Sequence, residues 1–298
     1  RHALLARLLR VPSIVFAVNK LDAVDEPQAA FSVVRDALQS FANEAGLDAL
    51  AGIVPVSALR GDNVTQPLAA SWFEGPTLLQ LLESLPTAQE AAQGDLLLPV
   101  QYVALEHAHG KDQQGAGHQP RTLWGRIAQG RVHVGDEVQV FPSGQRAIVQ
   151  ALRRAGDEVD QALAGTSAGV VLDRQLDVSR GEWIATPGAL RANTRFEATL
   201  AWLDTEPAQP GRCYWLRHGN RWIQARIASI DHRLDIHTLE PTDAHELAVN
   251  DIGRVTVELQ QPLPLRPFAD SRTGGALIVV DPASHRTSGA LLVQAALQ

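Results

Sequence analysis

The chain of 298 residues contains no methionine, one cysteine and only two lysines, against 24 arginines. A single cysteine, Cys213, excludes an internal disulfide framework and is compatible with a reducing compartment. No apolar run approaches the roughly 18 residues that cross a membrane, and the N-terminus lacks a signal-peptide layout. We therefore expect a soluble, cytoplasmic protein with no membrane partner. Because methionine is absent, we also expect the natural N-terminus to lie upstream of Arg1.

The net charge is −7, and the acidic excess lies in the first third of the chain. Residues 1–95 hold 6 Lys+Arg against 11 Asp+Glu, whereas residues 96–188 hold 9 against 10 and residues 189–298 hold 11 against 12. The sequence has no basic stripe of the kind typical of nucleic-acid-binding proteins. We therefore expect no specific nucleic acid partner, and we expect the arginines of residues 212–226 to lie on a solvated strand face.

Strand and helix patterns alternate over residues 1–94, which predicts a parallel sheet covered by helices. The predicted elements are a helix over 1–10, a strand over 13–18, a helix over 26–45, a strand over 53–59 and a helix over 75–85. Asp25 is expected to cap the second helix. Only about half of a complete domain of this kind is expected in this segment.

Short strands separated by turns follow from about residue 95. Segments such as GRVHVGDEVQVFPSG predict a small closed β-barrel over 95–188, and the same style over 189–298 predicts a second barrel. Gly219 and Asn220 are expected to form a hairpin turn there. The predicted fold class is therefore α/β plus all-β: a half α/β domain followed by two small β-barrels.

An apolar, β-branched run that begins at Ile14 ends in Asn19-Lys20-Leu21-Asp22. Asn and Asp suit a turn, but turn chemistry does not predict one of only two lysines. Open α/β sheets bind ligands at the carboxyl ends of their strands. A carboxylate there can accept hydrogen bonds from the N1–H and the exocyclic amine of guanine, a donor pair that adenine lacks. A plain turn remains the alternative interpretation.

One helix and one strand later the chain reads Ser57-Ala58-Leu59. The backbone N–H groups of these residues could donate to guanine O6. The two motifs, in this order, resemble the base-recognition motifs of the GTPase superfamily. The resemblance implies that Ser57, Ala58 and Leu59 contribute to a GTP-binding site.

The same resemblance implies distinct roles for the residues of the first motif. Asn19 is expected to brace the loop, Lys20 to cover the base with its alkyl stem, and Asp22 to read the base edge. No Gly-x-x-x-x-Gly-Lys-[Ser/Thr] loop occurs in the sequence. The phosphates of GTP and its Mg²⁺ are therefore expected to depend on a segment upstream of this chain, and no catalytic residue is expected within it.

Segments distributed over nearly the whole chain narrow the resemblance. RGDNVTQPLAASWFEGPTLLQLLESL, LDVSRGEWIA and TGGALIVVD resemble the GTPase subunits of bacterial sulfate adenylyltransferases. This family implies a subunit that couples GTP hydrolysis to the formation of adenosine 5′-phosphosulfate from ATP and sulfate. It also implies a small catalytic partner subunit. The alternatives are an elongation factor that delivers aminoacyl-tRNA, and a scaffold that has lost nucleotide binding.

Three further features allow competing interpretations. His107, His109 and His118 lie in a polar segment that is more typical of an exposed loop than of a zinc site. Trp72 and the adjacent Phe73 could pack as a lid on a barrel of the same chain or contact a partner. Residues 180–181, Arg-Gly, are expected to form a hairpin corner and no contact.

We predict that the 298-residue chain by itself hydrolyses no GTP, because positioning of the phosphates and of the attacking water depends on segments it lacks. The measurement is phosphate release from the purified chain, with buffer alone as the control. Turnover above the buffer rate would contradict the requirement for an upstream phosphate-binding loop.

Overall fold

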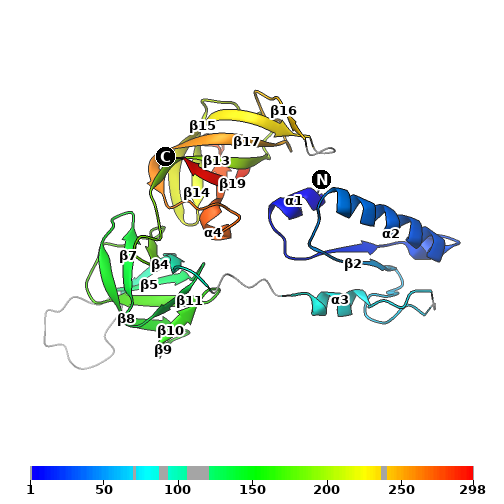
Figure 1. Cartoon of the computed structure of the whole chain (residues 1–298), viewed down its shortest axis with the longest axis horizontal. Helices are drawn as coiled ribbons and strands as arrows, with labels where there is room; N and C mark the ends of the chain where they lie inside the picture. Colours follow the sequence, from blue (N-terminus) through cyan, green and yellow to red (C-terminus); the bar gives the residue numbers. More distant parts are fainter. Residues whose placement is uncertain (1, 70–71, 87–92, 106–120, 236–239, 298) are drawn as a thin grey trace. The chain divides into compact units, whose positions relative to one another are not determined.

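The structure, a computed structural model, describes residues 2–69, 72–86, 93–105, 121–235 and 240–297. The chain divides into two compact units, residues 1–88 and 89–298 (Figure 1). The three-domain division with boundaries at residues 94 and 188 stays a prediction. The three histidines of the polar loop lie outside the described residues, so the choice between loop and zinc site also stays open.

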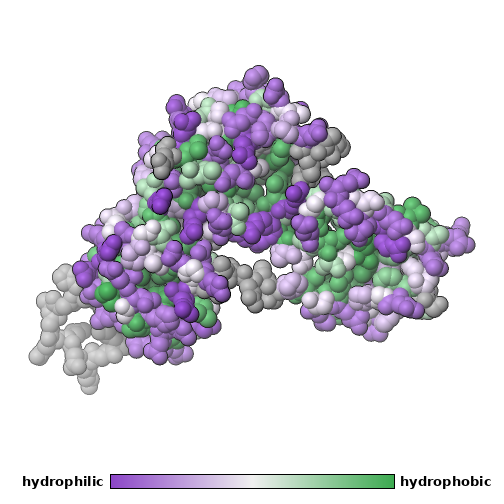
Figure 2. Space-filling view, viewed as in Figure 1, coloured by the Kyte–Doolittle hydropathy of each residue, from purple (hydrophilic) through white to green (hydrophobic). Residues whose placement is uncertain are grey.

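The first unit is an α/β layer built on two parallel strands. Its elements are α1 (His2–Leu8), β1 (Ile14–Val18), the 3-10 helix η1 (Leu21–Ala23), α2 (Pro27–Glu44), β2 (Leu50–Pro55) and α3 (Leu78–Ser84). β1 pairs with β2 in parallel, with Phe16 opposite Ile53 and a register shift between Ile14 and Val15. α2 buries Phe31 and Ala42, while β1 is only partly buried and apolar residues are visible on the surface of this unit (Figure 2). Among the described helices, none is long and apolar enough to cross a membrane.

The helix ends in this unit differ from the sequence predictions. Asp25 is not the cap of α2: the helix follows Glu26, whose side chain makes no capping hydrogen bond. α3 instead has a capping box that the sequence analysis missed. The Thr77 hydroxyl accepts from the Gln80 N–H at 3.1 Å, and the Gln80 side-chain oxygen accepts from the Thr77 N–H at 3.0 Å. These reciprocal bonds satisfy two N–H groups at the start of α3.

The second unit begins with a closed barrel. Its strands are β3 (Leu97–Pro99), β4 (Tyr102–Leu105), β5 (Arg121–Arg126), β7 (Glu137–Phe141), β8 (Arg146–Arg154), β9 (Asp157–Val159), β11 (Ser167–Leu172) and β12 (Trp183–Ala185). β6 (Arg131–His133) and β10 (Gln161–Leu163) pair with each other in a separate two-stranded sheet. The order β3-β12-β7-β8-β11-β5-β4 closes because β3 and β4 are consecutive parts of one extended run. Gly125 allows the close crossing, since a Cβ there would lie 2.3 Å from the Pro99 carbonyl oxygen.

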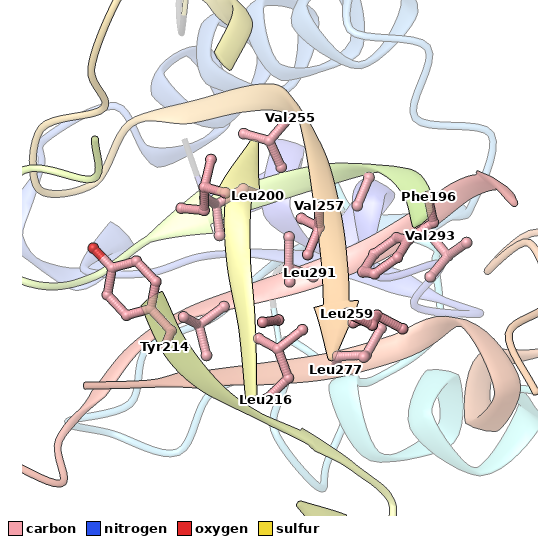
Figure 3. Close-up of a cluster of buried hydrophobic side chains, with 14 of the residues drawn as sticks. Phe196, Leu200, Tyr214, Leu216, Val255, Val257, Leu259, Leu277, Leu291 and Val293 are labelled. Carbon is pink, nitrogen blue, oxygen red and sulfur yellow. The ribbon is translucent and has the colours of Figure 1, made fainter. Parts of the chain in front are cut away.

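A second closed barrel completes this unit. Its elements are β13 (Asn193–Trp202), β14 (Cys213–His218), β15 (Arg221–Leu234), β16 (Pro241–Thr242), β17 (Ile252–Leu263), α4 (Arg272–Gly275), β18 (Ala276–Val280) and β19 (Thr287–Leu297). The order β14-β18-β19-β13-β17-β15 closes because β14 also pairs with β15. Figure 3 shows side chains from these strands, such as Phe196, Leu216 and Val257, meeting in one buried core. An α/β layer followed by two β-barrels confirms the predicted fold class.

The β14–β15 hairpin of the second barrel contacts β12 of the first. The Trp183 and His218 rings stack with their centroids 5.4 Å apart and their planes at 12°. His218 is buried, and its Nε2 lies 3.2 Å from the Gly274 carbonyl oxygen, to which it donates as the neutral tautomer. The Arg180 guanidinium donates to the Asn220 side-chain oxygen at 3.2 Å. Residues 180–181 form the predicted corner, where Gly181 has a φ of 91° and the Glu182 N–H donates to the Ser179 carbonyl at 3.1 Å. The expectation that they make no contact is wrong.

We predict that acidification destabilises this unit through His218. Burial lowers the pKa of His218 to about 4, whereas an imidazole in an unfolded chain titrates near about 6.5. Between these values the unfolded chain binds a proton that the folded chain excludes. Stability therefore rises with pH through this window and is level above it. The difference between the two pKa values corresponds to on the order of 3 kcal/mol in the free energy of unfolding.

The measurement is the free energy of unfolding at about pH 7 and pH 4.5, for the unsubstituted chain and for His218→Gln. The variant should lose less stability on acidification. His245→Gln, which removes an exposed histidine, should behave as the unsubstituted chain does. An equal pH dependence in all three proteins would contradict the role given to His218.

Candidate nucleotide-binding site

Parallel pairing of β1 and β2 places the loops after both strands at one edge of the sheet. The first loop begins at Asn19, directly after Val18, and the second follows Pro55. β2 ends at this proline, so the strand predicted over 53–59 is wrong in its second half. Ser57 forms an isolated bridge with Asp62, and residues 58–60 form a turn. A turn in place of a strand leaves the backbone of the second loop free to bend toward the first.

The Asn19 side chain joins the two loops. Its oxygen accepts hydrogen bonds from the Lys20 N–H at 2.7 Å and from the Ala58 N–H at 2.9 Å. Lys20 takes a left-handed conformation with φ of 67°, which turns the chain sharply at the end of β1. Its side chain is exposed. One amide oxygen thus links residues that are 39 positions apart along the chain.

Asp22 and Ser57 form a second link between the loops. The hydrogen bond from the Ser57 side chain is the main cause that lowers the pKa of Asp22, and the positive charge of Arg60 contributes less. The Ser57 hydroxyl is buried and accepts from the Arg60 N–H at 3.1 Å. The lowered pKa favours an ionised Asp22 carboxylate at the edge of the sheet. The sequence analysis assigned only a backbone role to Ser57 and missed its hydroxyl.

The backbone donors of the second loop are not equally available. The Ser57 N–H donates to the Asp62 carbonyl at 3.1 Å, and the Ala58 N–H is bound by Asn19. Within the part of the chain that the structure describes, no hydrogen bond uses the Leu59 N–H. The Leu59 side chain is 87% exposed. Of the three N–H groups considered from the sequence, that of Leu59 is the one open to a ligand.

A buried asparagine, Asn63, anchors the second loop. Its side chain is fully buried and donates to the Pro55 carbonyl at 2.9 Å, and its own carbonyl accepts from the Leu78 N–H at 3.0 Å. It adopts a positive φ of 56°, which asparagine tolerates better than most residues. Asn63 was not among the residues predicted from the sequence, although the run Gly-Asp-Asn at 61–63 is typical of a turn.

Trp72 and Phe73 pack against α2 of their own unit. The Phe31 ring centroid lies 5.7 Å from that of Trp72 and 5.7 Å from that of Phe73. Both aromatic residues are partly buried. The two rings therefore pack on α2, and the interpretation that they form a lid on a barrel is wrong. The contact with Phe31 gives both rings a structural role within the first unit.

Other potentially reactive groups form no second site among the described residues. No group of three or more His, Cys, Asp or Glu side chains in this part of the chain could hold a metal ion. Cys213 is exposed on β14. The side chains with chemistry suited to a nucleotide base are those of the two loops.

Comparisons with known proteins agree with this arrangement. A family model described as GTP-eEF1A C-terminal domain-like matches residues 195–294. Sulfate adenylyltransferase subunit 1 of Laribacter hongkongensis is 35% identical over 300 residues, which cover 99% of this chain and 60% of that protein. The bifunctional enzyme CysN/CysC of Mycobacterium tuberculosis is 37% identical over 298 residues, which cover 98% of this chain and 47% of that protein. The chain thus spans 60% or less of the length of these two relatives.

Solved structures share the fold. The crystal structure of Sup35 complexed with GDP matches with a TM-score of 0.61 and 22% sequence identity, and the match covers 100% of this chain and 72% of that chain. A likeness at this identity concerns the fold alone. The relatives at 35% and 37% identity extend over nearly all of this sequence, and they confirm the resemblance to sulfate adenylyltransferase subunit 1 that the sequence predicted.

Proposed function

We propose that this chain supplies the guanine-recognising part of the GTP site in a sulfate adenylyltransferase subunit 1. The complete protein would couple GTP hydrolysis to the formation of adenosine 5′-phosphosulfate and pyrophosphate from ATP and sulfate. The observation that carries the proposal is the Asn19 side-chain oxygen, which accepts from N–H groups of both loops at the edge where β1 and β2 end. The hydrogen bond from Ser57, which lowers the pKa of Asp22, supports it. The relatives' name, sulfate adenylyltransferase subunit 1, supports the reaction class.

The geometry suits guanine for chemical reasons. An ionised carboxylate only accepts hydrogen bonds, and guanine offers two adjacent donors, N1–H and the C2 amine, whereas adenine does not. The Leu59 N–H, which has no partner within the described residues, could donate to guanine O6. The Lys20 stem could lie along one face of the base with its ammonium group in water. These contacts would bind the base and select it, but they would not act on the phosphates.

The phosphates and Mg²⁺ need residues that this sequence does not contain. No phosphate-binding loop occurs in the 298 residues, and no metal-binding cluster is found among the described residues. In GTPases the γ-phosphate and Mg²⁺ order switch segments, and hydrolysis releases them. In the complete protein this release would be the step that drives the partner, and the adenylyl-transfer residues would lie on that partner subunit.

We predict that Asp22→Asn in the full-length protein weakens GTP binding about tenfold or more, because a charge-assisted acceptor becomes a mixed donor and acceptor. The same change should improve binding of xanthosine triphosphate, whose C2 carbonyl accepts from an amide N–H. The measurement is a fluorescence titration with both nucleotides. Asp25→Asn, which changes an exposed carboxylate three residues away, is the control. Unchanged guanine preference in Asp22→Asn would contradict the proposed base site.

We predict that the full-length protein forms a complex with the small catalytic subunit, through its first unit and first barrel, and does not bind tRNA specifically. A protein interface should withstand a rise from about 50 to 200 mM salt far better than tRNA binding, which weakens steeply as counterions are released. The measurement is titration at both salt concentrations with tRNA as competitor. Saturable tRNA binding without a subunit complex would instead support the elongation-factor alternative.

A further inference from the structure

One row of side chains crosses three adjacent strands on the outside of the second barrel. Arg217 on β14 lies opposite Trp222 on β15 and opposite Ile278 on β18. Trp222 is 49% exposed and Ile278 is 41% exposed. Trp215, two residues before Arg217 on β14, is partly buried on the same outer face. We name these four residues, Trp215, Arg217, Trp222 and Ile278, the aromatic face.

The outer wall of a barrel that faces only water is ordinarily polar at such positions. Large exposed apolar side chains grouped on neighbouring strands mark interaction sites, and tryptophan and arginine are the residues most enriched at the energetic centres of protein interfaces. Two of the six tryptophans of the chain lie on this face. Neither is needed to fill the barrel core, which is formed by the inward side chains of the same strands.

Arg217 supplies the charge of the aromatic face. Its guanidinium lies over the Trp222 ring, 5.6 Å from the centroid, and its Nε donates to the Gly219 carbonyl at 2.9 Å. Among the described residues it forms no ion pair. Arg212 and Arg226, on the same hairpin, are both paired with carboxylates. Arg217 is thus oriented by its neighbours but not neutralised.

The surroundings favour a protein over a nucleic acid. Next to the aromatic face, a shallow groove is lined by Cys213, Gln224, Arg226 and Glu258 among others. The Glu258 carboxylate there neutralises Arg226 at 2.6 Å. A polyanion needs several unpaired cations in a row. On the outward side of the β14–β15 hairpin, Arg217 is the one arginine without a carboxylate partner among the described residues, because Arg226 is paired with Glu258 and Arg221 lies on the other side, where it donates to Gln261. The aromatic face suits an apolar side chain flanked by a single carboxylate.

We propose that the aromatic face docks the partner subunit, through a segment of that subunit that presents an apolar side chain beside an Asp or Glu. The contact would add to the one expected at the first unit and first barrel. The identity of the partner rests on the function proposed above, but the chemistry of the face does not. The carboxylate would pair with Arg217, and the apolar side chain would cover Trp222.

The experiment titrates purified partner subunit onto the full-length protein and onto three variants. Trp222→Ala should weaken the complex about tenfold or more, as expected for an aromatic side chain at the centre of an interface. Arg217→Glu should weaken it as well, and added salt should then strengthen binding because like charges face each other. Leu203→Ala, which truncates a 53% exposed leucine elsewhere on this barrel, is the matched control and should bind as the unsubstituted protein does.

A second readout uses Cys213, the only cysteine among the 298 residues, which is exposed on the same strand as Arg217. Bound partner should slow maleimide alkylation of the peptide that contains Cys213, as followed by mass spectrometry. The inference is overturned if the unsubstituted protein forms the complex and if Trp222→Ala and Arg217→Glu both bind the partner subunit with a Kd within twofold of its value. If the variants lose binding to tRNA but still bind the subunit, the inference is also overturned, and the aromatic face is then an RNA-binding surface. If the unsubstituted protein forms no complex, the proposed function fails and the partner named here fails with it.

Discussion

The parallel pairing of β1 with β2 is the constraint on which the candidate site depends. It brings two polar loops, separated by a helix and a strand in the sequence, to the same edge of one sheet. The Asn19 side-chain oxygen then accepts from both loops, and the buried Ser57 hydroxyl holds Asp22. Each of these contacts requires the correct strand register, since a slip of one residue would turn the side chains to the other face. The geometry of the two loops is therefore a consequence of how two short strands pair.

Much of this arrangement could be predicted from the sequence because it depends on local patterns. The apolar run before Asn19 predicted β1, and the order of the two motifs predicted that their loops would meet. Alternating segments punctuated by Gly predicted two barrels, and the hairpin turn at Gly219 is present as expected. These features depend on periodicity and turn chemistry, which a single sequence carries.

The remainder could not be predicted because it depends on contacts between residues far apart in the chain. Nothing local reveals that the Ser57 hydroxyl points at Asp22, or that Asn63 is buried with its amide on the Pro55 carbonyl. Asp25 has the right chemistry for a helix cap, yet the helix begins one residue later than a cap at that position would require. The stacking of His218 on a tryptophan of the other barrel likewise arises only once both barrels have closed.

A crystal structure of the full-length protein with GDP would show most directly whether the two loops recognise a guanine base. We expect the Asp22 carboxylate to accept from guanine N1–H and the C2 amine, with both distances at about 2.7–3.2 Å, and the Leu59 N–H to donate to O6. A base bound elsewhere on the protein, or one that presents a different edge to Asp22, would contradict this expectation.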